Sequence, residues 1–553
     1  MYESNLTIMI FAPLVIGIVL FTIKSHDRPT VIKVALSGSI AVFLYSLSLL
    51  WSYDSSDGSA IFQCVRKTPW INIGGYTTVS YHVGIDGISL WLVILTTFLT
   101  PITILSTYGS RIKNYREFLF ALLALETAVL GVFLSLDLVL FYIFWELVLI
   151  PMFFIIGLWG TGERIKSAMK FILFTMLGSF LMLVGILVLF HVSELKTFDI
   201  TRLYTDSGLM QLGLQSQSWL FWAFFVAFAV KVPIFPLHTW LPDAHTDAPT
   251  AGSVMLAALL LKLGTFGLLR FCMPMFPLAA QHFAVFICVL AVIGIIYGAW
   301  VATVQRDVKR LVAYSSISHL GLVVLGLFVF THNSITGAVL QMVNHGLTTG
   351  ALFLIVGMLY ERRHSRLIAD FGGIIRVMPF FGVIFWIITF ASIGLPGLNN
   401  FVGEFLVILG IFETATGSNI IFGMLAITGV IWCAVYMLWM FQRVMLGEIV
   451  HDENKSLKDI SRIEKIVLIP IVTAVFFIGL FSPVLTSKMS ASIAYALDLS
   501  TRAMASGEFG EIAMGVDSSH ERINDTSDFE FSFDNSAAFE KIASVQSEGS
   551  DAQ

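Results

Sequence analysis

The sequence has few charged residues. Only 12% of its 553 residues are Asp, Glu, Lys or Arg, whereas 57% are hydrophobic. The charged share is about half that of a typical soluble protein. We therefore predict a polytopic membrane protein of the all-α class. The net charge of −5 says nothing about a nucleic-acid partner, because the charge that matters in such a chain lies in loops and at isolated buried sites; we expect no such partner.

Cysteine is scarce as well. The four residues Cys64, Cys272, Cys288 and Cys433 form no CxxC or other ligand spacing. This spacing indicates neither a disulfide framework nor a zinc or iron-sulfur site, so we expect no metal and no redox cofactor in this chain. The N-terminus lacks a basic segment and a small-residue cleavage site, so the first apolar run is predicted to be a retained helix.

Long apolar runs, in contrast, recur along most of the chain. A hydrocarbon core of ~30 Å needs about 20 helical residues, and this length predicts about fourteen transmembrane helices. The runs cover residues 6–23, 31–51, 84–108, 115–134, 137–158, 168–191, 218–241, 251–271, 281–303, 311–331, 335–360, 379–412, 418–442 and 463–484. Residues 52–83, which are rich in turn-forming residues, are expected to form a hairpin outside the membrane.

Two of these runs are interrupted by proline. Lys231 ends the apolar run from Trp219, and Pro233 and Pro236 follow it directly. Proline removes a backbone donor, so the helix is predicted to break beside the charge. Pro396 interrupts the overlong run 379–412 in the same way. Broken backbone at membrane depth persists only where it is buried in protein or lines a wet cavity, which favours an ion path over a lysine that merely snorkels to the surface.

The paired breaks indicate an internal repeat. They lie in the seventh and twelfth runs, and Gly178 and Gly185 in the sixth run match Gly350 and Gly357 in the eleventh. Five runs separate the members of each pair, so the two copies would face opposite ways across the bilayer. The alternative is a chance similarity between two helices rich in small residues.

These observations divide the chain into five segments. Residues 1–112 are expected to hold helices one to three, and residues 113–272 the first five-helix repeat. Residues 280–446 would form the inverted second repeat, and residues 460–500 the last helix with a short amphipathic extension. Residues 501–553 are acidic and are predicted to be a disordered tail.

The basic residues are distributed asymmetrically between the loops. Loops within residues 24–33, 111–116, 164–166, 306–310, 362–376 and 443–462 carry most of the Lys and Arg. The opposite side receives only Arg66, Lys67, Lys196, Arg202 and Arg270. The positive-inside rule therefore predicts that both termini lie on the outer side of the membrane.

Four runs carry an ionisable residue near mid-membrane, namely Glu146, Lys231, Lys262 and Glu404. Each costs about 2.5–3.5 kcal/mol at a helix centre unless it is paired or hydrated. Mutual pairing would lower this cost, and the natural hypothesis pairs Glu146 with Lys231. Movement of the carboxylate would then switch the lysine between holding and releasing a proton.

Histidines complete a candidate proton path. His319 and His345 lie inside runs ten and eleven, and His238 lies on the broken seventh run. Histidine titrates close to neutral pH and is suited to relaying protons, although a packing role is the alternative for each ring taken alone. Other ionisable residues are interpreted structurally: His191, His282 and His332 as interfacial, Asp137 as a helix cap and Glu126 as a buried carboxyl without an obvious partner.

Several motifs resemble a known family. They consist of Trp145, Glu146 and Pro151 with Gly157 and Gly160, of the run 241–253 containing Asp243 and His245, of Leu260 to Gly264 around Lys262, and of Gly84 to Leu90. These motifs are similar to those of subunit M of bacterial NADH:quinone oxidoreductase, respiratory complex I. The resemblance extends to about residue 500, and the acidic tail departs from it.

The resemblance implies an antiporter-like subunit of the inner-membrane arm with one proton channel, driven remotely by quinone reduction in the respiratory chain. NADH, FMN, iron-sulfur clusters and quinone would bind partner subunits, and L-type and N-type subunits would be neighbours. Glu146 corresponds to the family's gating carboxylate and Lys231 to the lysine that it gates. Lys262, His319 and His345 correspond to the central polar axis, and Glu404 to the exit residue.

Two other functions stay open at this stage. A subunit of a multisubunit cation/proton antiporter would share the fold and the buried lysines, although a glutamate at position 404 favours subunit M. An enzyme that itself binds quinone or a metal would need a ligand cluster, and the sequence offers none.

Overall fold

A computed structural model describes residues 5–505 except 57–58, 74–75, 111 and 415–417. The acidic segment predicted to be disordered, residues 506–553, lies outside this range.

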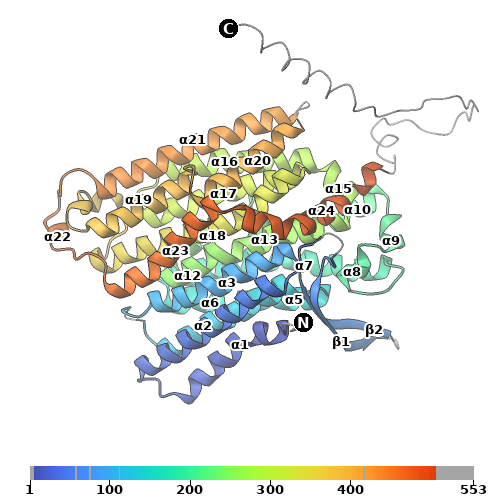
Figure 1. Cartoon of the computed structure of the whole chain (residues 1–553), viewed down its shortest axis with the longest axis horizontal. Helices are drawn as coiled ribbons and strands as arrows, with labels where there is room; N and C mark the ends of the chain where they lie inside the picture. Colours follow the sequence, from blue (N-terminus) through green and yellow to red (C-terminus); the bar gives the residue numbers. More distant parts are fainter. Residues whose placement is uncertain (1–4, 57–58, 74–75, 111, 415–417, 506–553) are drawn as a thin grey trace, which may run out of the picture. The chain divides into compact units, whose positions relative to one another are not determined.

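Helices make up most of the described chain and run side by side (Figure 1). Each of the predicted apolar runs contains a helix. Within the described residues, eleven helices are long and apolar enough to cross a membrane, and two more apolar helices, Leu6–Thr22 and Pro379–Ile393, are shorter. The elements not described individually below are α2 (Arg28–Ser52), α6 (Leu149–Trp159), α12 (Thr250–Met255), α14 (Met273–Met275), α15 (Pro277–His282), α16 (Ala284–Thr303), α22 (Asp452–Lys455) and the 3₁₀ turns η1 (Leu20–Thr22), η4 (Ile368–Asp370) and η5 (Ile374–Arg376).

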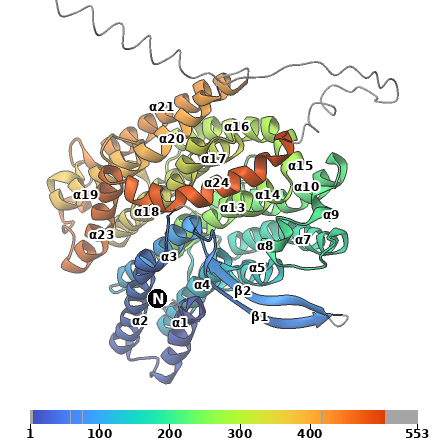
Figure 2. The same ribbon diagram turned by 45° about the vertical axis from the view of Figure 1, so that its right-hand side comes forward.

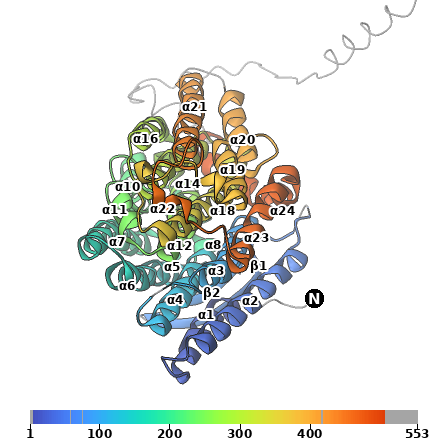
Figure 3. The same ribbon diagram turned by 90° about the vertical axis from the view of Figure 1, so that its left-hand side faces the viewer.

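Burial separates central from peripheral helices. The apolar windows of Thr250–Met275 and of α18 (His332–Arg363) are completely buried, whereas only 28% of the windows in α2 and in α23 (Arg462–Leu480) is buried. Seen from the end in Figure 3, α1 (Leu6–Val19) and α2 lie at one edge and α21 (Ser418–Met445) lies at the other. The two most enclosed segments carry Lys262 and His345, so these polar side chains lie at the centre of the bundle.

Both predicted helix breaks are confirmed. Helix α10 (Leu214–Lys231) ends at the lysine, and α11 (Trp240–Asp247) begins after a non-helical connection. Helices α19 (Pro379–Ile393) and α20 (Asn399–Glu413) are separated by a turn in which Gly394 and Gly397 have φ of 83° and 89°. Only glycine adopts this left-handed backbone without strain, so the turn depends on these two residues.

The helix that carries Lys262 is irregular, which the sequence did not predict. Two π-helical segments, η2 (Leu256–Leu260) and η3 (Leu268–Cys272), flank the short α13 (Leu261–Gly267). Isolated π turns are often found at functional sites because they reorient backbone carbonyls and side chains.

The expected hairpin outside the membrane is present as strands β1 (Gln63–Ile73) and β2 (Tyr76–Ile85), which pair antiparallel and project from one end of the bundle (Figure 2). The side chain of Asp199 anchors it: its Oδ2 lies 2.5 Å from Lys67 Nζ and 3.4 Å from His82 Nδ1. Burial alone would raise the pKa of Asp199, but the hydrogen bonds from His82 and Lys67 outweigh burial and hold that pKa well below its usual value.

The segment between α7 (Arg164–Val192) and α10 was not assigned any structure in the sequence, but it contains two one-turn helices, α8 (Ile200–Leu203) and α9 (Ser207–Met210). Asp137 caps α5 (Leu138–Leu147) by accepting hydrogen bonds from the amides of Val139 and Leu140, which confirms its structural interpretation. The last described helix, α24 (Pro483–Ala505), is longer than the expected extension and packs across α3 (Gly87–Ser106) and α18.

Candidate functional site

Lys262 contacts His345 at the centre of the bundle. The ammonium group donates to the carbonyl of Ala257 at 2.5 Å and lies 2.7 Å from Nδ1 of His345. Both side chains are fully buried. Because Ala257 belongs to the π segment η2, the irregular backbone places an acceptor at the lysine, and His345 of α18 provides the second one.

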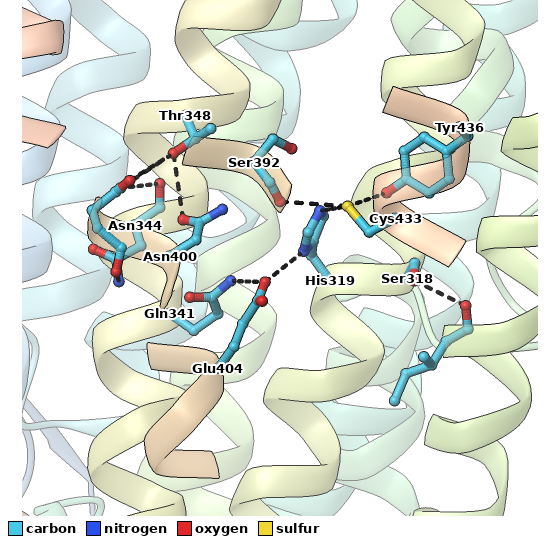
Figure 4. A network of polar contacts seen from close by, with 12 residues as sticks. Ser318, His319, Gln341, Asn344, Thr348, Ser392, Asn400, Glu404, Cys433 and Tyr436 are labelled. Carbon is cyan, nitrogen blue, oxygen red and sulfur yellow. Dashed lines mark hydrogen bonds and ion pairs between the residues drawn. The ribbon is translucent and has the colours of Figure 1, made fainter. Parts of the chain in front are cut away.

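The chain of contacts continues through His319 to Glu404. The ring centres of His345 and His319 are 5.8 Å apart. Nδ1 of His319, on α17 (Val308–Phe328), lies 3.3 Å from Oε1 of Glu404 on α20. Figure 4 shows His319 between Glu404 and Cys433. The structure therefore brings four of the predicted site residues together, and we call Lys262, His345, His319 and Glu404 the central chain.

The position of Glu404 is fixed from two sides. The side-chain amide of Gln341 donates to its Oε1 at 3.2 Å. A methyl group on Gly394 would lie 2.6 Å from its Oε2, so the glycine at the helix break leaves room for the carboxylate. The broken helix thus positions Glu404 as well as interrupting the backbone.

Other polar neighbours of the central chain were not predicted. Sγ of Cys433 lies 3.6 Å from Nε2 of His319, and the hydroxyl of Tyr436 donates to the same sulfur at 3.1 Å (Figure 4). On α18, the side chain of Asn344 donates to the carbonyl of Asn399 at 2.8 Å. The sequence held a signal for this face of α18, because Gln341, Asn344, His345 and Thr348 recur at helical spacing.

In this structure Glu146 and Lys231 form no direct ion pair, although the carboxylate still interacts electrostatically with the ammonium group. Lys231 Nζ instead donates to the backbone carbonyl of Trp145 at 3.1 Å and lies 3.7 Å from the centre of its indole ring. Glu146 is half-buried, and its Oε1 has no hydrogen-bond partner among the described residues. A carbonyl and an aromatic face stabilise the ammonium group here, one residue away from the carboxylate.

The two buried lysines and the two buried carboxylates were also expected to compensate one another's charges, but they do not do so by direct contact. Among the described residues, no ion pair joins either lysine to either carboxylate. Lys262 is paired with a histidine, Glu404 with another histidine and Lys231 with a tryptophan. The imidazole rings of His345 and His319 lie between Lys262 and Glu404, which therefore form no direct ion pair.

His238 is not in contact with the central chain. It is buried, and its ring packs against Phe235 and Tyr297 with ring centres 5.6 Å and 5.0 Å apart. A different histidine, His245, is fully buried and stacks in parallel on Phe353 of α18 at 4.7 Å. Neither ring nitrogen of His245 has a hydrogen-bond partner in the described chain. The sequence placed His245 in a motif but gave no signal of its burial.

Two basic side chains hold the C-terminal end of α11. Lys309 donates to the carbonyl of Ala248 at 2.5 Å, and Arg366 donates to the carbonyl of Thr246 at 2.5 Å. Basic groups at a helix C-terminus satisfy free carbonyls and interact favourably with the helix dipole. Glu126, on α4 (Tyr115–Leu134), is fully buried, and neither of its oxygens makes a hydrogen bond of good geometry among the described residues.

A metal site is absent from the part of the chain that the structure describes, since no three His, Cys, Asp or Glu residues cluster there.

Comparisons with known proteins identify the architecture around this site. Residues 135–431 match the family model described as "NADH:quinone oxidoreductase/Mrp antiporter, TM", and residues 6–132 match "NADH-ubiquinone oxidoreductase chain 4, amino terminus". The NADH-quinone oxidoreductase subunit M of Rhodobacter capsulatus is 42% identical over 521 residues, which cover 91% of this chain and 99% of that protein. The chain belongs to the subunit M family of NADH:quinone oxidoreductase.

Other members of the subunit M family agree. The protein of that name from Rickettsia conorii (strain ATCC VR-613 / Malish 7) is 42% identical over 88% of this chain and 97% of its own length. A chain of respiratory complex I from Thermus thermophilus with bound NADH superposes with a TM-score of 0.79 at 29% identity, covering 89% of this chain and 99% of that chain. The resemblance to subunit M noted in the sequence is confirmed.

The fold extends beyond the subunit M family. A chain of the Mrp complex from Dietzia sp. DQ12-45-1b superposes with a TM-score of 0.78 at 19% identity, covering 91% of this chain and 99% of that chain. Identity this low shows a shared fold alone, so it does not decide between a redox-driven pump and an antiporter.

Proposed function

We propose that this chain translocates protons across a bacterial inner membrane as a membrane-arm subunit of NADH:quinone oxidoreductase, driven by quinone reduction in other subunits. The observation that carries this proposal is the central chain, in which four buried titratable side chains from α13, α17, α18 and α20 follow one another. Buried ionisable groups in a membrane protein are costly, and they mark ion pathways.

The central chain would work as a relay. Lys262 hands a proton to Nδ1 of His345 across a contact of 2.7 Å. Imidazole can accept a proton at one nitrogen and release one from the other, so His345 passes charge toward His319. His319 then protonates Glu404, from which the proton would leave on the outer side.

Lys231 and Glu146 would control the relay. Glu146 directly follows Trp145, whose carbonyl and ring hold the Lys231 ammonium group. Approach of the carboxylate would stabilise the charged lysine, and its withdrawal would favour the neutral form. A small shift of α5 in response to a neighbouring subunit would therefore change the charge of Lys231.

Water would complete the path. Nε2 of His345, Oδ1 of Asn344 and both ring nitrogens of His245 are buried without a hydrogen-bond partner in the described chain. Buried polar atoms of this kind usually bind ordered water. We propose that water reaches Lys262 past His245, and that His238 serves the entrance near α11 and not the central chain.

The finer architecture is part of the proposal. We propose fourteen membrane spans with both termini on the outer side. Residues 113–272 and 280–446 would form the two inverted repeats, preceded by the N-terminal helices at residues 1–112 and followed by the last helix and its extension at residues 460–500. Support comes from packing, because α7 contacts α10 and α11 just as α18 contacts α19 and α20. The matched glycines pack differently: Gly178 faces Ala227 of α10, whereas Gly350 faces Val254 of α12. Their similarity therefore adds no support.

The partners follow from the family. The similar solved structures are complexes of several subunits, and we propose that L-type and N-type antiporter-like subunits flank this chain. NADH, FMN, iron-sulfur clusters and quinone would bind other subunits. The Mrp-like fold supports one alternative, a subunit of a multisubunit cation/proton antiporter.

The test uses the assembled complex in inverted membrane vesicles. Lys262→Ala, Lys231→Ala and Glu146→Ala are each expected to reduce NADH-driven acidification sharply, together with coupled quinone reduction. Glu163→Gln, which alters an exposed carboxylate paired with Lys166, is the matched control and should pump normally. Wild-type pumping by the three alanine variants would contradict the proposal. Cation/proton exchange that needs no NADH would favour the antiporter.

A further inference from the structure

A hollow of about 870 Å³ lies at one end of α21, and none of the residues that line it belongs to the proposed relay. Residues 367–369, 371–372, Trp439, Gln442, Leu446 and Val450 contribute to its walls, and Arg306 and Arg443 also line it. It opens at the end of the bundle that carries most of the basic loops. By the positive-inside rule this is the cytoplasmic face.

The two arginines of the hollow lack the carboxylate partners that four other arginines at this end have. Arg310, Arg362, Arg363 and Arg366 each form an ion pair with a carboxylate. Arg306 and Arg443 are exposed, and neither forms an ion pair within the described chain. Two unpaired guanidinium groups that line one hollow favour an anionic ligand, because a guanidinium matches phosphate oxygens with two parallel hydrogen bonds.

Exposed apolar side chains around the hollow favour a position at the membrane surface. Val450 is 77% exposed, Leu367 48% and Leu446 43%, although all three belong to connecting segments. Trp439, one turn before Arg443, lies where tryptophan concentrates at membrane interfaces. Exposed loop residues of this kind are stable among lipid headgroups, where their apolar parts leave water.

We propose that this hollow binds the phosphate of an anionic phospholipid headgroup through Arg306 and Arg443. Basic pockets between transmembrane helices on the cytoplasmic side are suited to such headgroups. The amide of Gln442 adds a donor. Glu448 also lines the hollow, and its one carboxylate against two guanidinium groups leaves the site positive. The acyl chains would lie along the exposed apolar face of α21, which includes Ile431, Val435 and Leu438.

The experiment compares lipid binding to the purified complex by native mass spectrometry. Phosphatidylglycerol is titrated into the delipidated wild-type complex and into complexes carrying Arg306→Ser, Arg443→Ser or both. The affinity of one bound lipid is expected to fall about fivefold for each single change and about thirtyfold for both. NADH:quinone turnover should stay normal, which keeps this test separate from the proposed proton path.

The control is Arg376→Ser, because Arg376 is exposed at the same end but does not line the hollow. Its complex should bind phosphatidylglycerol as the wild type does, and phosphatidylcholine should bind the wild type more weakly. Unchanged affinity in the double variant would overturn the proposal. Inorganic phosphate binding as tightly as the lipid would overturn the lipid assignment, and density for a neighbouring subunit's carboxylate in the hollow would overturn the site.

Discussion

Replacement of His345 tests the middle of the central chain. In His345→Ala, Lys262 loses the acceptor that lies 2.7 Å from its ammonium group and keeps the carbonyl of Ala257. A hydrogen bond to a charged group contributes about 1.5–3 kcal/mol. At 1.4 kcal/mol for each factor of ten, loss of this contact corresponds to a factor of about 10 to 100 in any step that depends on it.

A second variant separates pairing from relay. In His345→Gln, the side-chain oxygen can still accept a hydrogen bond from Lys262, but an amide does not take up and release protons near neutral pH. This variant should assemble and keep Lys262 paired, yet fail to pass protons to His319. We expect both variants to pump at less than about a tenth of the wild-type rate, because a positioned acid-base group typically contributes a factor of 10²–10⁴.

The assay is NADH-driven acidification of inverted vesicles, with assembly checked by the amount of complex and by NADH oxidation through an artificial acceptor. His282→Gln, at a helix end near the surface, is the matched control. Pumping at the wild-type rate by His345→Gln would refute the relay, since the variant would then conduct protons without a titratable group at this position.

Three further changes test other contacts. Trp145→Leu removes the ring over the Lys231 ammonium group, a contact of about 2 kcal/mol when desolvated, and should reduce pumping in the vesicle assay more than Trp145→Phe does. Gly394→Ala should reduce pumping because its methyl group would displace Glu404. Gly397→Ala introduces the same backbone strain but has open space around it, so it should lower only the free energy of unfolding, by about 1–2 kcal/mol. Equal pumping by the two variants would contradict this prediction. Asp199→Asn should lower the melting temperature throughout pH 5–8. The pKa of the Asp199 carboxylate is depressed in the folded protein, so the charged form stabilises the fold at every pH above its ordinary pKa near 4. That stabilisation is lost only as the pH falls from the ordinary pKa through the depressed one.

Much of the fold follows from the sequence. Apolar runs of membrane length predicted the helices, and a lysine followed by two prolines predicted the end of α10 at Lys231. These features are local: hydropathy, chain length and a missing backbone donor act within a few residues. The buried positions of Lys262 and Glu404 were predicted for the same reason.

The pairing of the site residues was beyond the sequence. Lys262 and His345 are 83 residues apart, and their contact depends on how α13 and α18 are rotated against each other. Charge alone favoured the pair Glu146 and Lys231, but the ammonium group points to the carbonyl and ring of Trp145 instead. The π segments around α13 also have no local signature, because apolar residues of this kind are compatible with regular helix.

The contact between His319 and Cys433 illustrates the same limit. The spacing of the four cysteines gave no indication of a metal site, and it said nothing about the neighbours of each single side chain. Cys433 meets His319 because α17 and α21 pack together. Tertiary packing therefore brings Cys433, which carries no sequence signal of its own, next to the proposed path.

Density for ordered water in the assembled complex, in a cryo-EM map at about 2 Å, tests the proton path most directly. The proposed path predicts water at Nε2 of His345 and at the ring nitrogens of His245, continuous from the cytoplasmic face to Lys262 and from Glu404 to the outer face. Dry, closely packed protein on both sides of Lys262, in every state of the turning-over complex, would contradict it.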